Sequence, residues 1–473
     1  MFSHLNHSTN TAWFFSVLIA ALVFSLSMAG VAAAQTNTSL GAGALQSNTT
    51  GSLNTAIGFV ALGSNTTGSV NTANGVDALF SNTTGSINTA SGVDALFNNT
   101  TGNANTATGV SSLRSNTIGS DNTASGVDAL SSNTSGNSNT ATGVLALFNN
   151  TTGDANTAIG QQVLFSNTTG PDNTASGFQA LFSNTIGENN TATGVLALFS
   201  NTTGNFNTAN GVNALFSNTT GSSNTASGLN ALLSNTLGVG NTASGLNALL
   251  SNATGDLNTA MGLSALFHNT TGSQNTAIGV DADVSVGNLS NATAIGFGAV
   301  VNVSNKVRLG NAAIQVIEGQ VPFTFSSDKT KKENFQPVDG EAVLRKIRGF
   351  ELSSWNFIGH DPEKFRHYGP MAQDFFAAFG HDGVGQIGSE TTINSGDLAG
   401  ILMIAVQALE KRTAELKQKD AQIAVLQSEV KDLKDKHAYF DTVAARLEAL
   451  ELRKIGGEKA SHLLRLRSDM PCR

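Results

Sequence analysis

Charged residues are scarce in the first two-thirds of the chain. Residues 1–34 contain no Asp, Glu, Lys or Arg, and residues 35–326 contain three basic and eleven acidic residues. The remaining 147 residues hold 22 basic and 22 acidic residues, so the net charge of −8 belongs to the first part. This distribution provides no basic surface for nucleic acid, and we expect no nucleic-acid partner.

Cysteine and long apolar segments are also nearly absent. The one cysteine, Cys472, lies beside the C-terminus, so the chain forms no internal disulfide. An apolar run at Trp13–Phe24 leads to Ala32–Ala34, a small-residue cleavage site. We therefore predict a signal peptide at residues 1–34 and a secreted or cell-surface protein with no membrane segment after its removal. An uncleaved anchor is the alternative, because no Lys or Arg precedes the apolar run.

A 17-residue repeat fills most of the uncharged part. Asn-Thr-Ala recurs fourteen times at unbroken spacing from Asn54 to Asn275, in a unit that reads N-T-A-x-G-x-x-A-L-F-S-N-T-T-G-x-x. A fixed period of this length indicates turns stacked along one axis. Two glycines per unit mark sharp turns, and segments between them such as Val76–Phe80 are too short for helices. We predict a mainly β repeat array at residues 35–281, with two short strands in each turn.

Each repeat offers little apolar material for a core. Ordering the backbone costs about 1–2 kcal/mol per residue, whereas burying one Leu or Phe returns about 1.5–3 kcal/mol. The array therefore requires either several chains packed together, which would also explain the recurring Phe, or tight closure by ladders of Asn and Thr.

The repeat itself leaves several functions open. The sporadic Asp residues do not form the glycine- and aspartate-rich motif of calcium-binding rolls. Regular Thr residues could form a flat ice-binding or carbohydrate-binding face. The array could also be a rigid spacer without a ligand of its own, or an adhesive fibre.

We expect the repeat register to break at Ala282. The segments Asn291–Ala299 and Ser304–Asn311 then resemble the head of YadA-like trimeric autotransporter adhesins. In that family three chains build one head. The resemblance implies a trimeric left-handed β-roll or solenoid that closes with a head-end segment at residues 282–324.

The sequence after Phe325 has the pattern of an α+β domain. Helical spacing at Glu341–Ile347 and alternation at Gly349–Phe357 predict a helix and a strand, and Asp397 is the expected cap of a long helix. From Leu409, apolar residues at heptad positions predict a parallel coiled coil over residues 409–455. We expect residues 456–473 to be a disordered tail.

Three motifs follow one another in this part: S-D-x-x-x-K-x-N at 327–334, H-x-G-x-x-A-Q at 367–373, and D-L-x-x-x-L-x-x-A-V-Q-x-L at 397–409. In this order they resemble the C-terminal intramolecular chaperone domain of phage tailspikes and endosialidases. The resemblance implies that residues 325–408 form a domain that trimerises the fibre ahead of it and then cleaves itself off with a serine–lysine dyad.

Carried onto this sequence, the resemblance makes Ser327 the nucleophile, Lys332 the base and Ser326–Ser327 the cleaved bond. A serine hydroxyl reacts only when a neighbour removes its proton, and a lysine can do so only in its neutral form. Burial between chains, or charge from Lys329 and Lys331, would favour that form. Lys331 is the alternative base.

Other matched residues have supporting roles in the resemblance. Asp328 would fix the local turn, while His367, Gly369 and Gln373 would support the dyad from a cleft. The sequence departs from the family at Thr330-Lys331, where Arg-Leu is common, and at Pro370, which replaces an aromatic residue. Neither departure removes a member of the dyad.

Together these features predict an exported homotrimeric fibre, with a host surface or glycan as its target, that trimerises and autocleaves once as a serine endopeptidase. We expect no cofactor and no metal. One alternative is a surface adhesin that keeps its C-terminal domain as a permanent trimer clamp, without cleavage. Another is an ice- or carbohydrate-binding solenoid.

Overall fold

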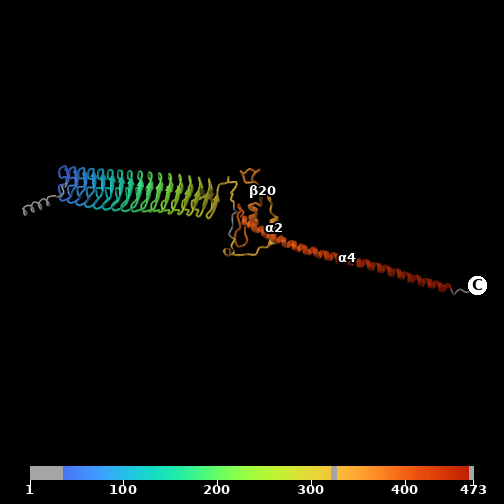
Figure 1. Ribbon diagram of the computed structural model, residues 1–473. Helices are drawn as coiled ribbons and strands as arrows, with labels where there is room; N and C mark the ends of the chain where they lie inside the picture. Colours follow the sequence, from blue (N-terminus) through green and yellow to red (C-terminus); the bar gives the residue numbers. More distant parts are fainter. Residues whose placement is uncertain (1–35, 321–326, 468–473) are drawn as a thin grey trace, which may run out of the picture. The chain divides into compact units, whose positions relative to one another are not determined.

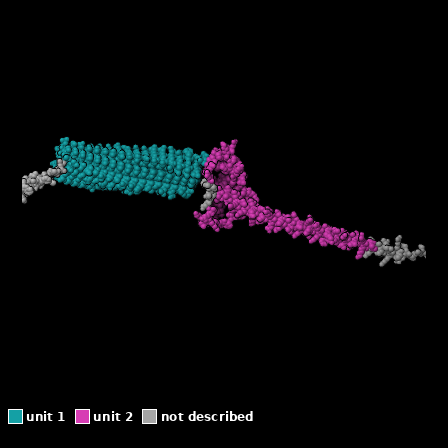
Figure 2. All heavy atoms as spheres, in the orientation of Figure 1, with its two compact units in different colours: residues 1–314 teal, residues 315–473 magenta. Residues whose placement is uncertain are grey.

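The structure is a computed structural model, described here for residues 36–320 and 327–467. The chain divides into two compact units, Met1–Ile314 and Gln315–Arg473 (Figure 2). The first is a parallel β-solenoid and the second is a small domain of helices and a two-stranded sheet that ends in a long helix (Figure 1). The predicted signal peptide, Ser326 and Cys472 lie outside the described residues.

Within the 17-residue repeats, each turn of the solenoid has one three-residue strand. In the repeat these strands are β1 (Thr38–Leu40), β2 (Thr55–Ile57), β3 (Thr72–Asn74), β4 (Thr89–Ser91), β5 (Thr106–Thr108), β6 (Thr123–Ser125), β7 (Thr140–Thr142), β8 (Thr157–Ile159), β9 (Thr174–Ser176), β10 (Thr191–Thr193), β11 (Thr208–Asn210), β12 (Thr225–Ser227), β13 (Thr242–Ser244), β14 (Thr259–Met261) and β15 (Thr276–Ile278). Each pairs in parallel with the strand one turn away. The prediction of two strands per turn is wrong, because Val76–Phe80 forms consecutive turns. Asp77 and Leu79 there adopt left-handed backbone angles, with φ of 55° and 52°.

The solenoid continues past the expected register break at Ala282. Strand β17 (Thr293–Ile295) pairs with β15 at the same 17-residue offset, and β16 (Asp283–Val284) pairs with β18 (Val300–Val301). The spacing changes only at β19 (Val307–Leu309), where Val307 lies opposite Thr293. The register break is therefore later than the sequence indicated.

Ladders of buried Asn close each turn on the next. Asn150 Nδ2 donates to Asn133 Oδ1 at 2.9 Å and to the carbonyl oxygen of Gly153 at 3.0 Å, and Asn150 Oδ1 accepts from Asn167 Nδ2 at 2.8 Å. A second ladder runs through Asn156, whose Oδ1 accepts from the backbone N–H of Asn173 at 3.0 Å. These bonds satisfy the buried amides within one chain. Of the two ways to build the array, the structure shows closure by ladders.

Alanine and leucine fill the remaining interior of the solenoid. Ala141, Ala146 and Leu147 have no exposed surface, and the same positions are buried in turn after turn. Glycine permits this close stacking, because a Cβ on Gly143 would overlap the carbonyl oxygen of Gly160. The recurring Phe residues lie outside this core.

The Phe residues form a half-buried stack along one chain. Rings of successive turns lie 5.1–5.4 Å apart at angles of 5–9°, in the series Phe148, Phe165, Phe182, Phe199 and Phe216. Ring stacking between turns therefore accounts for the repeated Phe without a second chain.

The buried leucine column ends on a carboxylate. Asp283 occupies the place that Leu266 has one turn earlier, and its backbone N–H donates to Ala299 as that of Leu266 does to Ala282. Asp283 is 6% exposed, and its Oδ2 lies 2.7 Å from Nδ1 of His268. Burial raises the pKa of the Asp283 carboxyl, against the opposing effect of the hydrogen bond with His268.

The second unit contains a short 3-10 helix η1 (Lys329–Lys331), helices α2 (Gly340–Arg348), α3 (Ala372–Phe379) and α4 (Ser395–Arg467), and strands β20 (Ser353–Trp355) and β21 (His367–Gly369). Its core consists of Val343, Phe375, Phe379 and Ala405, so the first turns of α4 belong to the domain itself. The predicted helix near 341–347 and the strand near 349–357 are both present.

Two details of α4 differ from the prediction. Asn394, rather than Asp397, caps the helix, since Asn394 Oδ1 accepts from the N–H of Gly396 at 2.8 Å. The backbone also stays helical through Arg467, beyond residue 455, where the sequence indicated the start of a disordered tail.

We predict that Asn150→Ala lowers the unfolding midpoint of the solenoid far more than Asn149→Ala. Asn150 is fully buried, and its loss leaves polar partners in both adjacent turns unsatisfied, at a cost of about 1–3 kcal/mol each. Asn149 is half-buried and is the matched control. Chemical denaturation followed by circular dichroism measures both; equal midpoints would contradict the ladder's role.

We predict that the buried carboxyl of Asp283 makes the stability of the solenoid depend on pH. Because its folded pKa is raised above the ordinary 3.8, its protonated form stabilises the fold below that pH, and this contribution is lost as pH rises through the folded pKa. The thermal midpoint of wild type should therefore fall relative to Asp283→Asn as pH rises from about 4. Asp281→Asn, at an exposed neighbouring carboxylate, should show no such trend, and a constant difference between wild type and Asp283→Asn would refute the assignment.

Candidate functional site

The first described residues after position 326 form a tight turn. Asp328 caps η1, and its Oδ1 accepts from the N–H of Thr330 at 2.9 Å. This backbone hydrogen bond holds the pKa of the Asp328 carboxyl below its usual value. At the other end, the N–H of Lys332 donates to the carbonyl oxygen of Lys329 at 3.2 Å. These two hydrogen bonds close the turn from Asp328 to Lys332.

This turn brings Ser327 and Lys332 together. Lys332 Nζ donates to Ser327 Oγ at 2.7 Å. Lys329 instead lies over the ring of Phe335, at 5.9 Å from its centroid. No hydrogen bond joins Lys331 to Ser327 in the described part of the chain. The geometry therefore favours Lys332 over Lys331 as the partner of the serine.

Both side chains of the pair are exposed in the single chain. A charged ammonium can donate to the serine oxygen but cannot take its proton. A neutral lysine at the same distance would accept the hydrogen bond instead. The pair thus has the spacing that a nucleophile and its base require, without the burial that would activate them.

The second motif lies on a separate hairpin and helix. His367 and Gly369 belong to β21, which pairs in antiparallel register with β20, and Gln373 lies in the first turn of α3. The ring of His367 stacks on Trp355 with centroids 4.7 Å apart. Between residues 327 and 467, no hydrogen bond or ring contact joins these three residues to Ser327 or Lys332.

Arg366 has a structural role that the sequence analysis missed. Its Nη2 donates to the carbonyl oxygen and Oγ of Ser354, at 2.9 and 2.6 Å, and its Nη1 donates to Asn356 Oδ1 at 3.1 Å. Arg366 therefore fixes β20 against the segment that enters β21. Only the pairing of β20 with β21 brings Arg366 next to Ser354 and Asn356, and the H-x-G-x-x-A-Q motif does not indicate this pairing.

Two buried polar atoms near this hairpin lack partners. Trp355 Nε1 and His360 Nδ1 have no hydrogen bond in the single chain. Phe357 lies beside both rings, in edge contact with Trp355 and His360. The hairpin thus presents an aromatic cluster with unused hydrogen-bonding capacity.

An ion pair attaches α2 to α4. Arg412 Nε donates to both carboxylate oxygens of Glu341 at 3.0 Å, and Nη2 makes a further close contact with Oε2. The hydrogen bond with Arg412 lowers the pKa of the Glu341 carboxyl. Arg412 falls on a heptad core position in the sequence, and the structure shows that it serves the domain's own packing.

No cluster of three or more His, Cys, Asp or Glu residues suited to a metal ion occurs in the described ranges. Within those same ranges, none of the helices combines the length and apolar character needed to cross a bilayer.

The fold and this pair define a class of protein: a parallel β-solenoid followed by a small α+β domain that opens with a serine–lysine contact. Residues 327–383 match the family described as "Chaperone of endosialidase". The chain therefore carries a chaperone-of-endosialidase domain near its C-terminus, preceded by a β-solenoid. The match begins at Ser327 and includes the first two motifs, while the third motif lies beyond it. No curated protein shows significant similarity to the chain.

We predict that His367→Ala shifts the fluorescence of Trp355 to longer wavelength, because removal of the stacked imidazole exposes the indole to water. Tyr368→Ala is the control, since Tyr368 is the next residue and is 85% exposed. The measurement uses chains with Trp13→Phe, which leaves Trp355 as the single tryptophan. Equal spectra for both variants would show that the stack does not shield Trp355.

Proposed function

We propose that the chain is an exported homotrimeric fibre protein whose C-terminal domain drives trimerisation and then cleaves the Ser326–Ser327 bond. The observation that carries this proposal is the 2.7 Å contact between Lys332 Nζ and Ser327 Oγ at the start of the matched family region. The solenoid, whose last strand is β19 (Val307–Leu309), precedes this point and would remain as the fibre.

The proposed chemistry balances with one water molecule. Neutral Lys332 takes the Ser327 hydroxyl proton, and Oγ attacks the carbonyl carbon of Ser326, which lies outside the described residues. The C–N bond breaks, the Ser327 nitrogen takes a proton, and an ester joins Ser326 to Oγ. Water then hydrolyses the ester. The products are a carboxyl group on Ser326 and an amine on Ser327.

Assembly would control this reaction. In one chain Ser327 and Lys332 are both exposed to water, whereas a lysine acts as a base only in its neutral form. Packing of copies around this turn would remove that water and favour the neutral amine. Asp328, His367, Gly369 and Gln373 would then support the pair from the turn and from neighbouring surfaces. Unassembled chains would stay uncut.

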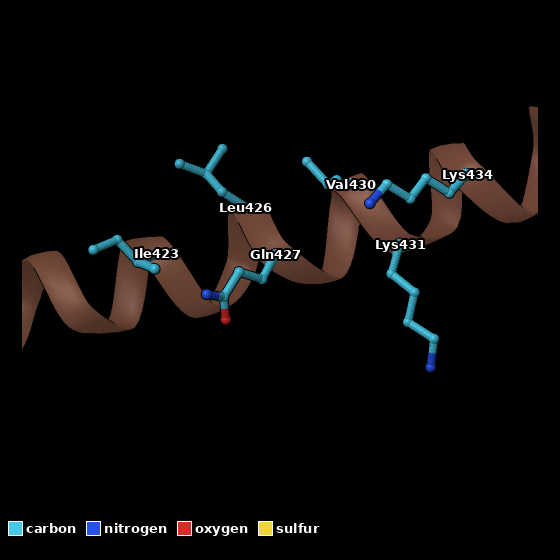
Figure 3. Close-up of a pocket in the computed structure, with 6 residues that line it drawn as sticks. All are labelled: Ile423, Leu426, Gln427, Val430, Lys431 and Lys434. Atoms are coloured by element: carbon cyan, nitrogen blue, oxygen red, sulfur yellow. The ribbon is translucent and has the colours of Figure 1, made fainter.

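The exposed heptad residues of α4 supply the surface for association. Leu426 and Val430 point to one side of the helix and Lys431 to the other (Figure 3). Apolar heptad residues are roughly half exposed along this side, including Leu416 at 60%, Ile423 at 49% and Leu433 at 64%. A parallel coiled coil of three copies would bury this row. Its place after the scissile bond makes it a clamp that cleavage removes.

We further propose that the fibre is exported and that it contacts a target outside the cell. The predicted signal peptide would place the fibre at the cell surface or in the medium, where it would contact a host surface or a glycan. A permanent clamp, with the same coiled coil and no cleavage, is the alternative that α4 supports equally.

We predict that folded wild type yields two fragments and that the smaller begins at Ser327. Ser327→Ala and Lys332→Ala should remain full length yet still trimerise, because neither change touches the core of the domain. Lys331→Ala is the matched control and should cleave as wild type does. Gel electrophoresis, N-terminal sequencing and light scattering measure fragment size, cut site and oligomeric state.

This experiment distinguishes autocleavage from a permanent trimer clamp. A single uncut band from trimeric wild type would refute autocleavage and favour the permanent clamp. Loss of cleavage in Lys331→Ala with full activity in Lys332→Ala would show that the base is assigned to the wrong lysine.

A further inference from the structure

One side of the solenoid carries three columns of outward side chains. In strands β2 to β15 the first and third residues point outward, while the Ala between them is buried, as in Thr140, Ala141 and Thr142. The first strand position, which is Thr in every turn from β1 to β15, forms the Thr column, and the third position forms the variable column. Hydrogen bonds between turns continue past the strand, from the N–H of Gly143 to Ser125 and from that of Leu145 to Val127. The residue two after the strand, such as Val144, therefore runs alongside as a third column.

This third column is apolar and exposed along nearly the whole array. Its members are between 40% and 57% exposed and are Phe59, Val76, Val93, Val110, Val127, Val144, Phe178, Val195, Val212, Leu229, Leu246, Leu263 and Val280. We call it the apolar column. Only Gln161 interrupts it between Phe59 and Val280. Such a long exposed apolar row is unusual on a surface that faces water.

No charged residue lies in any of the three columns from Thr38 to Val280. The acidic residues of the repeats occupy other positions of the unit: Asp77, Asp94, Asp121, Asp128, Asp154, Asp172, Glu188, Asp256 and Asp281. Identical chains that meet through one face place like charges opposite one another, so a charge-free face suits a second copy of the same chain.

The turn that contains Gln161 has an apolar residue in the variable column. Most turns have Ser, Thr or Asn there; the apolar members are Leu40, Ile57, Ile159, Met261 and Ile278, and of these Ile159, which is 48% exposed, is the one that lies beside a polar residue of the apolar column. Polar and apolar residues thus exchange columns in a single layer near the middle of the array. A lone polar layer in an apolar interface is the device that sets register in coiled coils, because its groups hydrogen bond only when aligned.

We propose that copies of the solenoid pack through this three-column face, in parallel and with equal turns side by side, and that the Ile159–Gln161 layer fixes their register. The inference rests on the proposed function, because the C-terminal domain is what joins the copies at the same end. In register, Gln161 amides meet one another and hydrogen bond. A shift of one turn would bury each amide against Val144 or Phe178.

The size of the face is sufficient for a stable interface. Strands about 4.8 Å apart make the array about 70 Å long, and three alternate positions span about 13 Å. The face then offers about 900 Å² per copy, compared with about 800 Å² per partner in standard specific complexes. After loss of the clamp, this face would hold the fibre together.

The first test uses disulfide trapping in the full chain with Cys472→Ser, which leaves an introduced cysteine as the single thiol. Val144→Cys should form a disulfide that links two chains of each trimer, because identical positions meet in a register of zero shift. Asp154→Cys, exposed in another column, should stay reduced. A trimer in which Val144→Cys stays reduced and reacts with thiol reagents overturns the inference and leaves the face free for another ligand, such as ice.

The second test compares two neighbouring glutamines. Gln161→Glu would bring carboxylates together in the interface, so the thermal midpoint of the trimer should fall at neutral pH and recover when pH drops below about 4.3. Gln162→Glu is the control, in a column that carries Asp in other turns, and should leave the midpoint nearly unchanged. Equal effects of both changes would overturn the role of Gln161. A monomeric wild type, by contrast, would refute the proposed function itself.

Discussion

Hydrogen bonds between buried asparagine amides are the interaction on which the solenoid depends. Each turn encloses little besides alanine and leucine, which alone cannot offset the loss of backbone freedom. The amide of Asn150 bonds to both adjacent turns and to Gly153, so it links the chain along the array and closes the turn in one step. Side chains outside the core, including the stacked Phe residues, follow from the spacing that these ladders impose.

The C-terminal domain is stabilised by a packed apolar core rather than by asparagine ladders. Its core is a small cluster around Phe375 and Phe379, and the first turns of α4 complete it. The ion pair between Glu341 and Arg412 fastens α2 to that helix. Ser327 and Lys332 lie on an exposed turn outside this core, and local hydrogen bonds hold this turn. The packed core and the exposed Ser327–Lys332 pair are therefore separate parts of one domain.

The sequence predicted the order of elements better than their local geometry. The 17-residue period indicated the stacked β array, and the resemblance to the chaperone domain paired Ser327 with Lys332, whose side chains are in contact. It did not distinguish strand from turn inside a repeat, because Val76–Phe80 has strand-forming residues but left-handed backbone angles at Asp77 and Leu79. The stacking of His367 on Trp355 and the contacts of Arg366 depend on strand pairing across a loop, which no local pattern encodes.

The uniform offset between paired strands makes the length of the array adjustable. Every turn from β1 to β15 contacts its neighbours through the same 17-residue register, with no contact that requires a particular number of turns. Removal or duplication of a whole 17-residue unit preserves every asparagine ladder and changes the length of the solenoid by about 4.8 Å. Gene-level expansion or contraction by multiples of 51 nucleotides could therefore tune how far such a rod extends without redesign of either end.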